Sequence, residues 1–428
     1  MLAEFKHSNL NLAQIYTLNS YKELNGKGLV ELNYTADYKV DEFIKKLSEQ
    51  NITYGDDVRD LIKSVVAPNA HLAIPERLSN DNAGCSSVIA QDNESGAWLL
   101  GRNYDLDINA NGTTAVVHTA PQNGYKSVGV ADMAQFGLGQ NNFEANKELL
   151  LYSPYVTMDG INEKGFAISI MVLSDGLVVQ NAADKSSLPS SLLVRYLLDN
   201  ADSVDSAIKL LNGMNLKPDY LLNNKLIQDF VGEKISYHWA MADANGNRAI
   251  IEYTNGKMNV IENPVHIDYD EANYNIALSH PNIAKPYLLS TNFHLSPDIN
   301  VNLKDADSGA WRYATLEKAL EKNPTPNENE LVEMMKSAKF YQNDFDTRMK
   351  IIQEGKDLGD PNSWEWITIW TDILNTSTKT MRLFDRENYT KEYDFGMDGS
   401  GAAAVISPLE AQQLTALIAK IAGDPGLF

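Results

Sequence analysis

The chain has 428 residues, of which 43% are hydrophobic and 22% are charged, a composition typical of globular proteins with an extensive core. Its formal net charge of −21 argues against nucleic acid and anionic membranes as partners, because binding to either needs basic surface. The single cysteine, Cys85, excludes an internal disulfide bond and a zinc site built from cysteines alone.

The N-terminus lacks the basic start and long apolar core of a signal peptide. No apolar run approaches the roughly 18 residues that a membrane-spanning helix needs. We therefore expect a cytoplasmic protein without a membrane span. The alternative is an exported protein whose signal was removed ahead of Met1.

Residues 1–84 are predicted to form a small, mainly helical segment. Residues 27–35 alternate as a strand does, and residues 38–65 carry apolar side chains at helical spacing in two runs broken at Gly55. Residues 66–84 hold two prolines and a polar string, which is typical of a linker. We therefore expect an exposed joint at Gly84–Cys85.

After Cys85 the pattern changes to strands joined by short turns. Turn residues at 92–96, 162–165 and 245–246 each separate two strand-like runs, and a fourth hairpin is expected over 364–385. A further strand is expected over 113–120.

Helices are expected between these hairpins. Pro189 can open one helix, and Ser203 and Gly213 can begin and end the next. Further helices are expected over 313–322, 328–338 and 407–423. Antiparallel strands with helices between them predict an α+β sandwich, in which two sheets pack face to face and helices cover both.

Cys85 begins a strand-like run, and the first hairpin can bring Arg102 and Asp105 back beside it. A neighbouring cation favours thiolate, and a carboxylate can hold an ammonium group. A cysteine nucleophile needs a base, but none of the seven histidines stands in a recognisable cysteine-protease signature. If the Gly84–Cys85 bond is cut, the freed α-amino group, with an ordinary pKa of about 7.7–8.0, is a suitable base. The alternative is a buried, inert cysteine.

The run GCSSVIAQ at 84–91, followed one hairpin later by LLGRNYDLD at 99–107, resembles a family of N-terminal-nucleophile hydrolases. This is the choloylglycine hydrolase, penicillin V acylase and acid-ceramidase-like group, and the related isopenicillin-N acyltransferase-like enzymes are also similar. Weaker matches follow in order: MDGINEKGFAISI at 158–170, HWAMADANGNRAIIE at 238–252, LLSTNFHLS at 288–296, SGAWRYATLEKAL at 308–320 and WTDILNTSTKTMRLF at 370–384.

The resemblance implies a four-layer αββα sandwich over residues 85–428, behind a prosegment, residues 1–84, that is cleaved before Cys85 and stays associated. The implied activity is hydrolysis of the linear C–N amide bond of a small-molecule N-acyl substrate through an acyl-enzyme. No cofactor and no metal ion are implied.

The resemblance also implies residue roles. Cys85 is the nucleophile, and it attacks the Gly84 carbonyl during self-cleavage. Arg102 and Asp105 position the amine and the thiol, Asn292 contributes to the oxyanion hole, and Arg312 completes the site electrostatically.

Each role has an alternative. Arg102 and Asp105 could form a surface ion pair, Asn292 could be a turn residue, and Arg312 could be a solvated helix arginine. One departure from the family concerns the end of the second hairpin, where bile-salt-type members carry asparagine or tyrosine and this chain reads IMVL at 170–173. A backbone N–H is then expected as the second oxyanion donor, and a bile-salt substrate is disfavoured.

Two further groups have more ordinary interpretations. Aromatic side chains could line an acyl pocket but are more often core: Trp364, Trp366, Trp370, Tyr341 and Phe345. Acidic residues beside His266 could bind a metal ion, but a loop of solvated acids is expected: Asp268, Asp270 and Glu271.

Three other functions remain open alternatives: an acyltransferase on the same scaffold, a non-catalytic binding protein that keeps the fold, and a cysteine–histidine protease. Whether the chain forms a homo-oligomer is also open.

Overall fold

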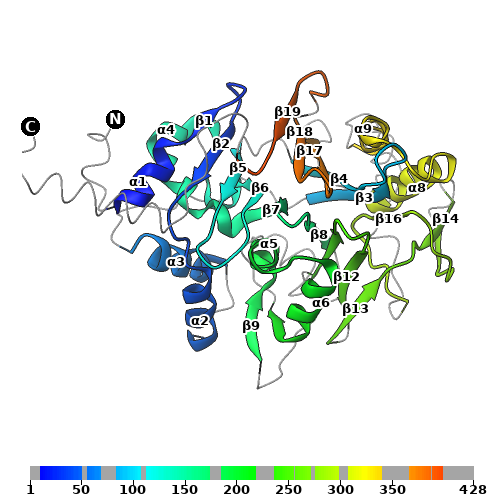
Figure 1. Cartoon of the computed structure of the whole chain (residues 1–428), viewed down its shortest axis with the longest axis horizontal. Coiled ribbons are helices and arrows are strands. Elements are labelled where there is room, and N and C mark those ends of the chain that lie inside the picture. Colours follow the sequence, from blue (N-terminus) through cyan, green and yellow to red (C-terminus); the bar gives the residue numbers. More distant parts are fainter. Residues whose placement is uncertain are drawn as a thin grey trace, which may run out of the picture.

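The computed structural model describes residues 10–50, 55–68, 83–107, 112–173, 185–217, 236–254, 256–270, 275–297, 307–339, 366–386 and 388–398 (Figure 1). The described helices are all too short or too polar to cross a membrane. The helix expected over 407–423 and most of the linker at 66–84 lie outside the described residues.

Among the described residues, the larger sheet has nine strands in the order β1-β2-β5-β6-β7-β8-β11-β12-β13. Neighbouring strands are antiparallel except β2 and β5, which run parallel. The strands are β1 (Lys22–Glu23), β2 (Leu29–Tyr34), β5 (Thr114–Thr119), β6 (Ser127–Asp132), β7 (Thr157–Asn162), β8 (Ala167–Leu173), β11 (Ser236–Ala242), β12 (Arg248–Thr254) and β13 (Lys257–Ile261).

The smaller sheet, as far as the structure describes it, has six antiparallel strands in the order β16-β3-β4-β17-β18-β19. These strands are β16 (Tyr287–Ser290), β3 (Ala83–Gln91), β4 (Trp98–Asp107), β17 (Trp366–Asn375), β18 (Thr380–Asp385) and β19 (Glu392–Phe395). Two strand pairs lie outside the sheets: β9 (Ser186–Pro189) with β10 (Met214–Lys217), and β14 (His266–Asp270) with β15 (Asn275–Ser279). The hairpins expected around 92–96, 162–165, 245–246 and within 364–385 are confirmed.

The two sheets pack face to face, with β3 and β4 against β8 and β11. Helices α8 (Asp307–Lys322) and α9 (Glu328–Ser337) cover the smaller sheet, and α5 (Leu193–Asn200) covers the larger one (Figure 1). A 3₁₀ helix over Lys147–Val156 also packs on the larger sheet. The predicted α+β sandwich with two facing sheets and outer helices is confirmed.

The N-terminal segment is built into this sandwich. Its helices are α1 (Leu12–Asn19), α2 (Val40–Gln50) and α3 (Gly55–Val66), so the expected break at Gly55 is confirmed. Its strand β2 is fully buried beside β5, and the Tyr34 hydroxyl donates to the Leu151 carbonyl oxygen at 2.7 Å. The expected exposed joint is wrong, because Gly84 and Cys85 are both buried within β3.

The other α-helices in the described part of the chain are α4 (Phe143–Asn146) and α6 (Val204–Asn212). Ser203 caps α6 through a capping box, as expected. Pro189 instead ends β9 and precedes a single 3₁₀ turn, so its expected place in the first turn of an α-helix is wrong.

Candidate active site

Cys85 lies near the start of β3 with only 1% of its surface exposed. Its backbone N–H donates to Asn292 Oδ1 at 2.7 Å, and its Sγ accepts a hydrogen bond from Arg102 Nη2 at 3.2 Å. Burial raises the pKa of the Cys85 thiol, and the charge of Arg102 opposes that rise only in part. In the uncut chain the thiol is therefore protonated at neutral pH.

Arg102 is fully buried between the two sheets. Its Nη1 donates to Asp159 Oδ2 on β7 at 2.6 Å, and its Nη2 also donates to the Ile170 carbonyl on β8 at 2.7 Å. The guanidinium lies over Tyr104, 4.5 Å from the ring centroid, and Tyr104 stacks on Trp370. The planar guanidinium thus faces a thiol, a carboxylate and a carbonyl at once, as its forked donors allow.

Arg102 and Asp105 do not pair with each other, so the surface ion pair is wrong. They are three residues apart on β4, and residues at an odd spacing point to opposite faces of a strand. Asp105 therefore meets α8, where Arg312 Nη1 donates to Asp105 Oδ2 at 3.0 Å. The second oxygen, Oδ1, accepts from Thr368 Oγ1 at 2.7 Å.

Gly84 pairs with Asp105 across the β3–β4 ladder. A Cβ atom at Gly84 would lie 3.2 Å from Arg312 Nη2 and 3.2 Å from Asp105 Oδ2. That is tighter than ordinary contact, so the missing side chain lets the arginine and the carboxylate approach the bond before Cys85.

Asn292 joins these groups, and the turn-only interpretation does not account for its contacts. Its Oδ1 accepts from Cys85 N–H and, at 2.7 Å, from Arg312 Nη2, while its Nδ2 donates to the Val172 carbonyl at 2.6 Å. Both partners of Oδ1 can only donate, which settles which end of the amide is the oxygen. Arg312 is fully buried, so the solvated-arginine interpretation is wrong.

The stretch at 170–173 contributes acceptors to the site. The Ile170 and Val172 carbonyls bind Arg102 and Asn292, respectively. A backbone N–H as the second oxyanion donor stays a prediction.

Sequence reasoning missed a buried acidic pair behind Arg102. Asp159 Oδ2 accepts from Trp370 Nε1 at 2.9 Å as well as from Arg102, and Asp372 lies opposite Arg102 across β4 and β17. Burial raises the pKa of both Asp159 and Asp372, and their mutual repulsion raises the pKa of Asp372 further. A proton on Asp372 turns the contact between the two carboxyl groups into a hydrogen bond.

Asp159 lies within the 158–170 match, but only the sheet topology shows that it meets Arg102. Trp370 is core, as the more ordinary interpretation predicted. Trp364, Tyr341, Phe345 and the Trp366 side chain lie outside the described residues.

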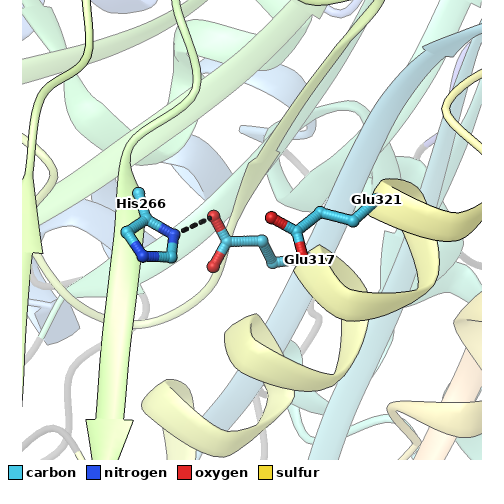
Figure 2. A group of neighbouring side chains, drawn as sticks. All are labelled: His266, Glu317 and Glu321. Carbon is cyan, nitrogen blue, oxygen red and sulfur yellow. Dashed lines mark hydrogen bonds and ion pairs between the residues drawn. The ribbon is translucent and has the colours of Figure 1, made fainter.

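His266, Glu317 and Glu321 could together hold a metal ion, and they point toward one another between β14 and α8 (Figure 2). Their potential ligand atoms all lie within 4.8 Å of one another. The expected loop is wrong, because 266–270 is strand β14, whereas Asp268 is exposed to solvent as expected. His266 Nδ1 lies 3.1 Å from Glu317 Oε1, and this contact joins the strand to the helix without an ion. Glu271 lies outside the described residues.

Residues 85–292 match the family model of linear amide C–N hydrolases, choloylglycine hydrolase family. The resemblance to this family is confirmed. Over 105 residues, which are 24% of its length, the chain is 33% identical to penicillin V acylase from Pectobacterium atrosepticum. The matched part spans about a quarter of that relative's length (26%).

Two similar solved structures share low sequence identity with the chain. One is a mutant of the conjugated bile acid hydrolase from Clostridium perfringens, with a TM-score of 0.44 and 15% identity, covering 73% of this chain and 92% of that one. The other is penicillin V acylase from Agrobacterium tumefaciens, with a TM-score of 0.41 and 14% identity, covering 73% of this chain and 86% of that one.

Proposed function

We propose that this chain is a cysteine amidase of the choloylglycine hydrolase family, which cuts its own Gly84–Cys85 bond and then hydrolyses the linear C–N amide bond of a small N-acyl substrate. The observation that carries the proposal is the pair of contacts at Cys85. Its thiol faces Arg102 and its backbone nitrogen faces Asn292. These are the two atoms that an N-terminal cysteine uses as nucleophile and base.

Self-cleavage begins when Cys85 Sγ attacks the Gly84 carbonyl carbon. The carbon–nitrogen bond breaks, the thiol proton passes to the departing nitrogen, and Gly84 is left as a thioester on Sγ. Water then hydrolyses the thioester, which releases a carboxylate at Gly84 and frees the Cys85 thiol and amine. Asn292 Oδ1 already accepts from the nitrogen that becomes this amine.

In turnover, the Cys85 amine takes the thiol proton and the thiolate attacks the substrate carbonyl carbon. The nearby Arg102 charge favours the thiolate. The Asn292 amide is the proposed donor to the oxyanion, and such a donor is worth about 10²–10³-fold in rate. The protonated amine then gives its proton to the leaving nitrogen, and water hydrolyses the acyl-thioester to the free acid.

Residues 1–84 are proposed to remain as a subunit after cleavage. Strand β2 is paired along its length with β5 and is completely buried, so leaving would break the larger sheet. The contact that supports this retention is made by strand β2, although most of the segment's regular structure is helical.

The test is intact-mass spectrometry of the wild type beside Cys85→Ala, followed by hydrolysis assays with penicillin V and a series of N-acyl amides. We expect two fragments that meet at Gly84–Cys85 in the wild type, one uncut chain in the variant, and hydrolysis only by the cut protein. Hydrolysis by an uncut wild type, or by the Cys85→Ala variant, would overturn the proposal. An added amine that captures most of the acyl group would point to an acyltransferase.

A further inference from the structure

A buried histidine–glutamate pair lies beside the proposed site, and the mechanism above does not use it. His238 on β11 faces Glu252 on β12, directly opposite in the strand register, with Nδ1 3.0 Å from Oε1. Both side chains are 0% exposed. Removing an ionisable pair from water is costly, so a purely apolar pair would serve packing as well.

Glu252 holds the chain segment that carries Asn292. Besides His238, its oxygens accept from the backbone N–H of Leu295 at 2.8 Å, and from the N–H and hydroxyl of Ser296 at 3.0 and 2.7 Å. Burial raises the pKa of Glu252, but His238 and His294, whose Nδ1 lies 3.5 Å from Oε2, outweigh burial and hold this pKa below its usual value. The group is therefore a carboxylate that binds one side of the 291–296 segment.

His238 binds the other side of the same segment. Its Nε2 lies 2.6 Å from the Thr291 carbonyl oxygen, which can only accept, so Nε2 donates this hydrogen bond, just as Nδ1 donates to the Glu252 carboxylate. That carbonyl belongs to the peptide bond between Thr291 and Asn292, so the contact fixes the plane from which the Asn292 side chain extends. The Thr291 hydroxyl adds a hydrogen bond to the Gly309 carbonyl at 2.8 Å.

We propose that His238, oriented by Glu252, is a positioning residue that aims the Asn292 amide at the reacting atoms of Cys85. The inference rests on the proposed function. It assigns to His238 no contact with the substrate and no proton transfer. Its action runs through the Thr291–Asn292 peptide.

Two substitutions separate positioning from packing. In His238→Gln, the side-chain amide nitrogen can reach the position of Nε2 and donate to the Thr291 carbonyl. In His238→Asn, the shorter side chain places its amide nitrogen only at the position of Nδ1, where it faces Glu252. Each variant therefore loses one of the two contacts, the glutamine that to Glu252 and the asparagine that to Thr291, and the two side chains are similar in volume. We expect similar thermal unfolding midpoints, with kcat about 10²-fold lower in the asparagine variant and nearer to wild type in the glutamine variant, because small misplacements can cost that much.

His118→Gln is the control. His118 Nε2 lies 3.0 Å from Glu31 Oε1 on neighbouring β5 and β2, and this pair is also buried. We expect a lower unfolding midpoint without a comparable loss of kcat. An equal fall of kcat in both His238 variants would overturn the inference. A rise of KM with an unchanged kcat in the asparagine variant would overturn it as well. An inactive wild type would instead overturn the proposed function.

Discussion

The Arg102 guanidinium donates a hydrogen bond to Cys85 Sγ at 3.2 Å, and both residues are buried. The arginine is held there by Asp159 and the Ile170 carbonyl, so its position does not depend on the thiol. A preorganised cation of this kind lowers the free energy of the thiolate without moving during the reaction.

Replacing Arg102 with glutamine should raise the pKa of the Cys85 thiol further, because the cation that opposes the effect of burial is lost. We expect self-cleavage at neutral pH to slow by about tenfold or more, the effect of one pKa unit. The pH at which cleavage reaches half its maximal rate should rise. Intact-mass spectrometry over a series of pH values measures both quantities, and an unchanged pH midpoint would contradict the assignment.

Asp372→Asn should stabilise the fold at neutral pH. The folded pKa of Asp372 is raised above its unfolded value by burial and by Asp159, so the folded state keeps a proton that the unfolded state has lost. Stability from this group therefore falls as pH rises from the unfolded pKa, about 3.9, toward the raised folded pKa. An asparagine amide keeps a donor to Asp159 at every pH.

We expect Asp372→Asn to gain about 1–3 kcal/mol at neutral pH, the usual cost of a buried polar group without its partner. The gain should shrink at acidic pH. Thermal unfolding is best compared in the uncut Cys85→Ala background, where the protein is one chain. A gain that is independent of pH would show that the proton on the acidic pair is not its cause.

Arg312→Lys should impair turnover more than binding. Arg312 bridges Asp105 and Asn292 with two different nitrogens, and a lysine ammonium is a single point that lacks this fork. We expect kcat to fall by about 10²-fold, in the range for loss of one aligned oxyanion donor, with little change in KM.

Thr368→Val is the matched comparison for Arg312→Lys, because it removes one hydrogen bond to Asp105 and leaves Arg312 in place. It should cost about 1 kcal/mol of stability. A comparable loss of kcat in both variants would mean that Asp105, rather than the link to Asn292, dominates the effect.

The fragment of residues 1–84 should remain bound after cleavage. Size-exclusion chromatography of the cut protein should show both fragments at the elution volume of the intact 47.5 kDa chain. Tyr34→Phe removes the hydrogen bond to the Leu151 carbonyl and should lower the denaturant concentration needed to separate the fragments, since one such bond contributes about 1 kcal/mol. Separation without denaturant would contradict the role of β2 in the sheet.

Local patterns were sufficient to predict the hairpins and most of the described helices. Alternation and turn residues act between neighbours in the chain, so the pairing of β3 with β4 could be predicted from residues 85–107 alone. The same patterns missed β6, because it pairs with β5 across a longer connection than a tight turn. They also missed β14, because the acidic residues within 266–270 made this strand resemble a polar loop.

The sequence by itself determined that the only cysteine lies near the start of a strand and that an arginine and a carboxylate return beside it. Only the tertiary structure decided their partners: Arg102 pairs with Asp159 on β7, and Asp105 pairs with Arg312 on α8. The alternation of a strand sends Arg102 and Asp105 to opposite faces, one toward the second sheet and one toward the outer helices. The residues that each side chain meets on its face belong to segments distant in the chain, and the spacing of neighbouring residues does not determine how those segments pack.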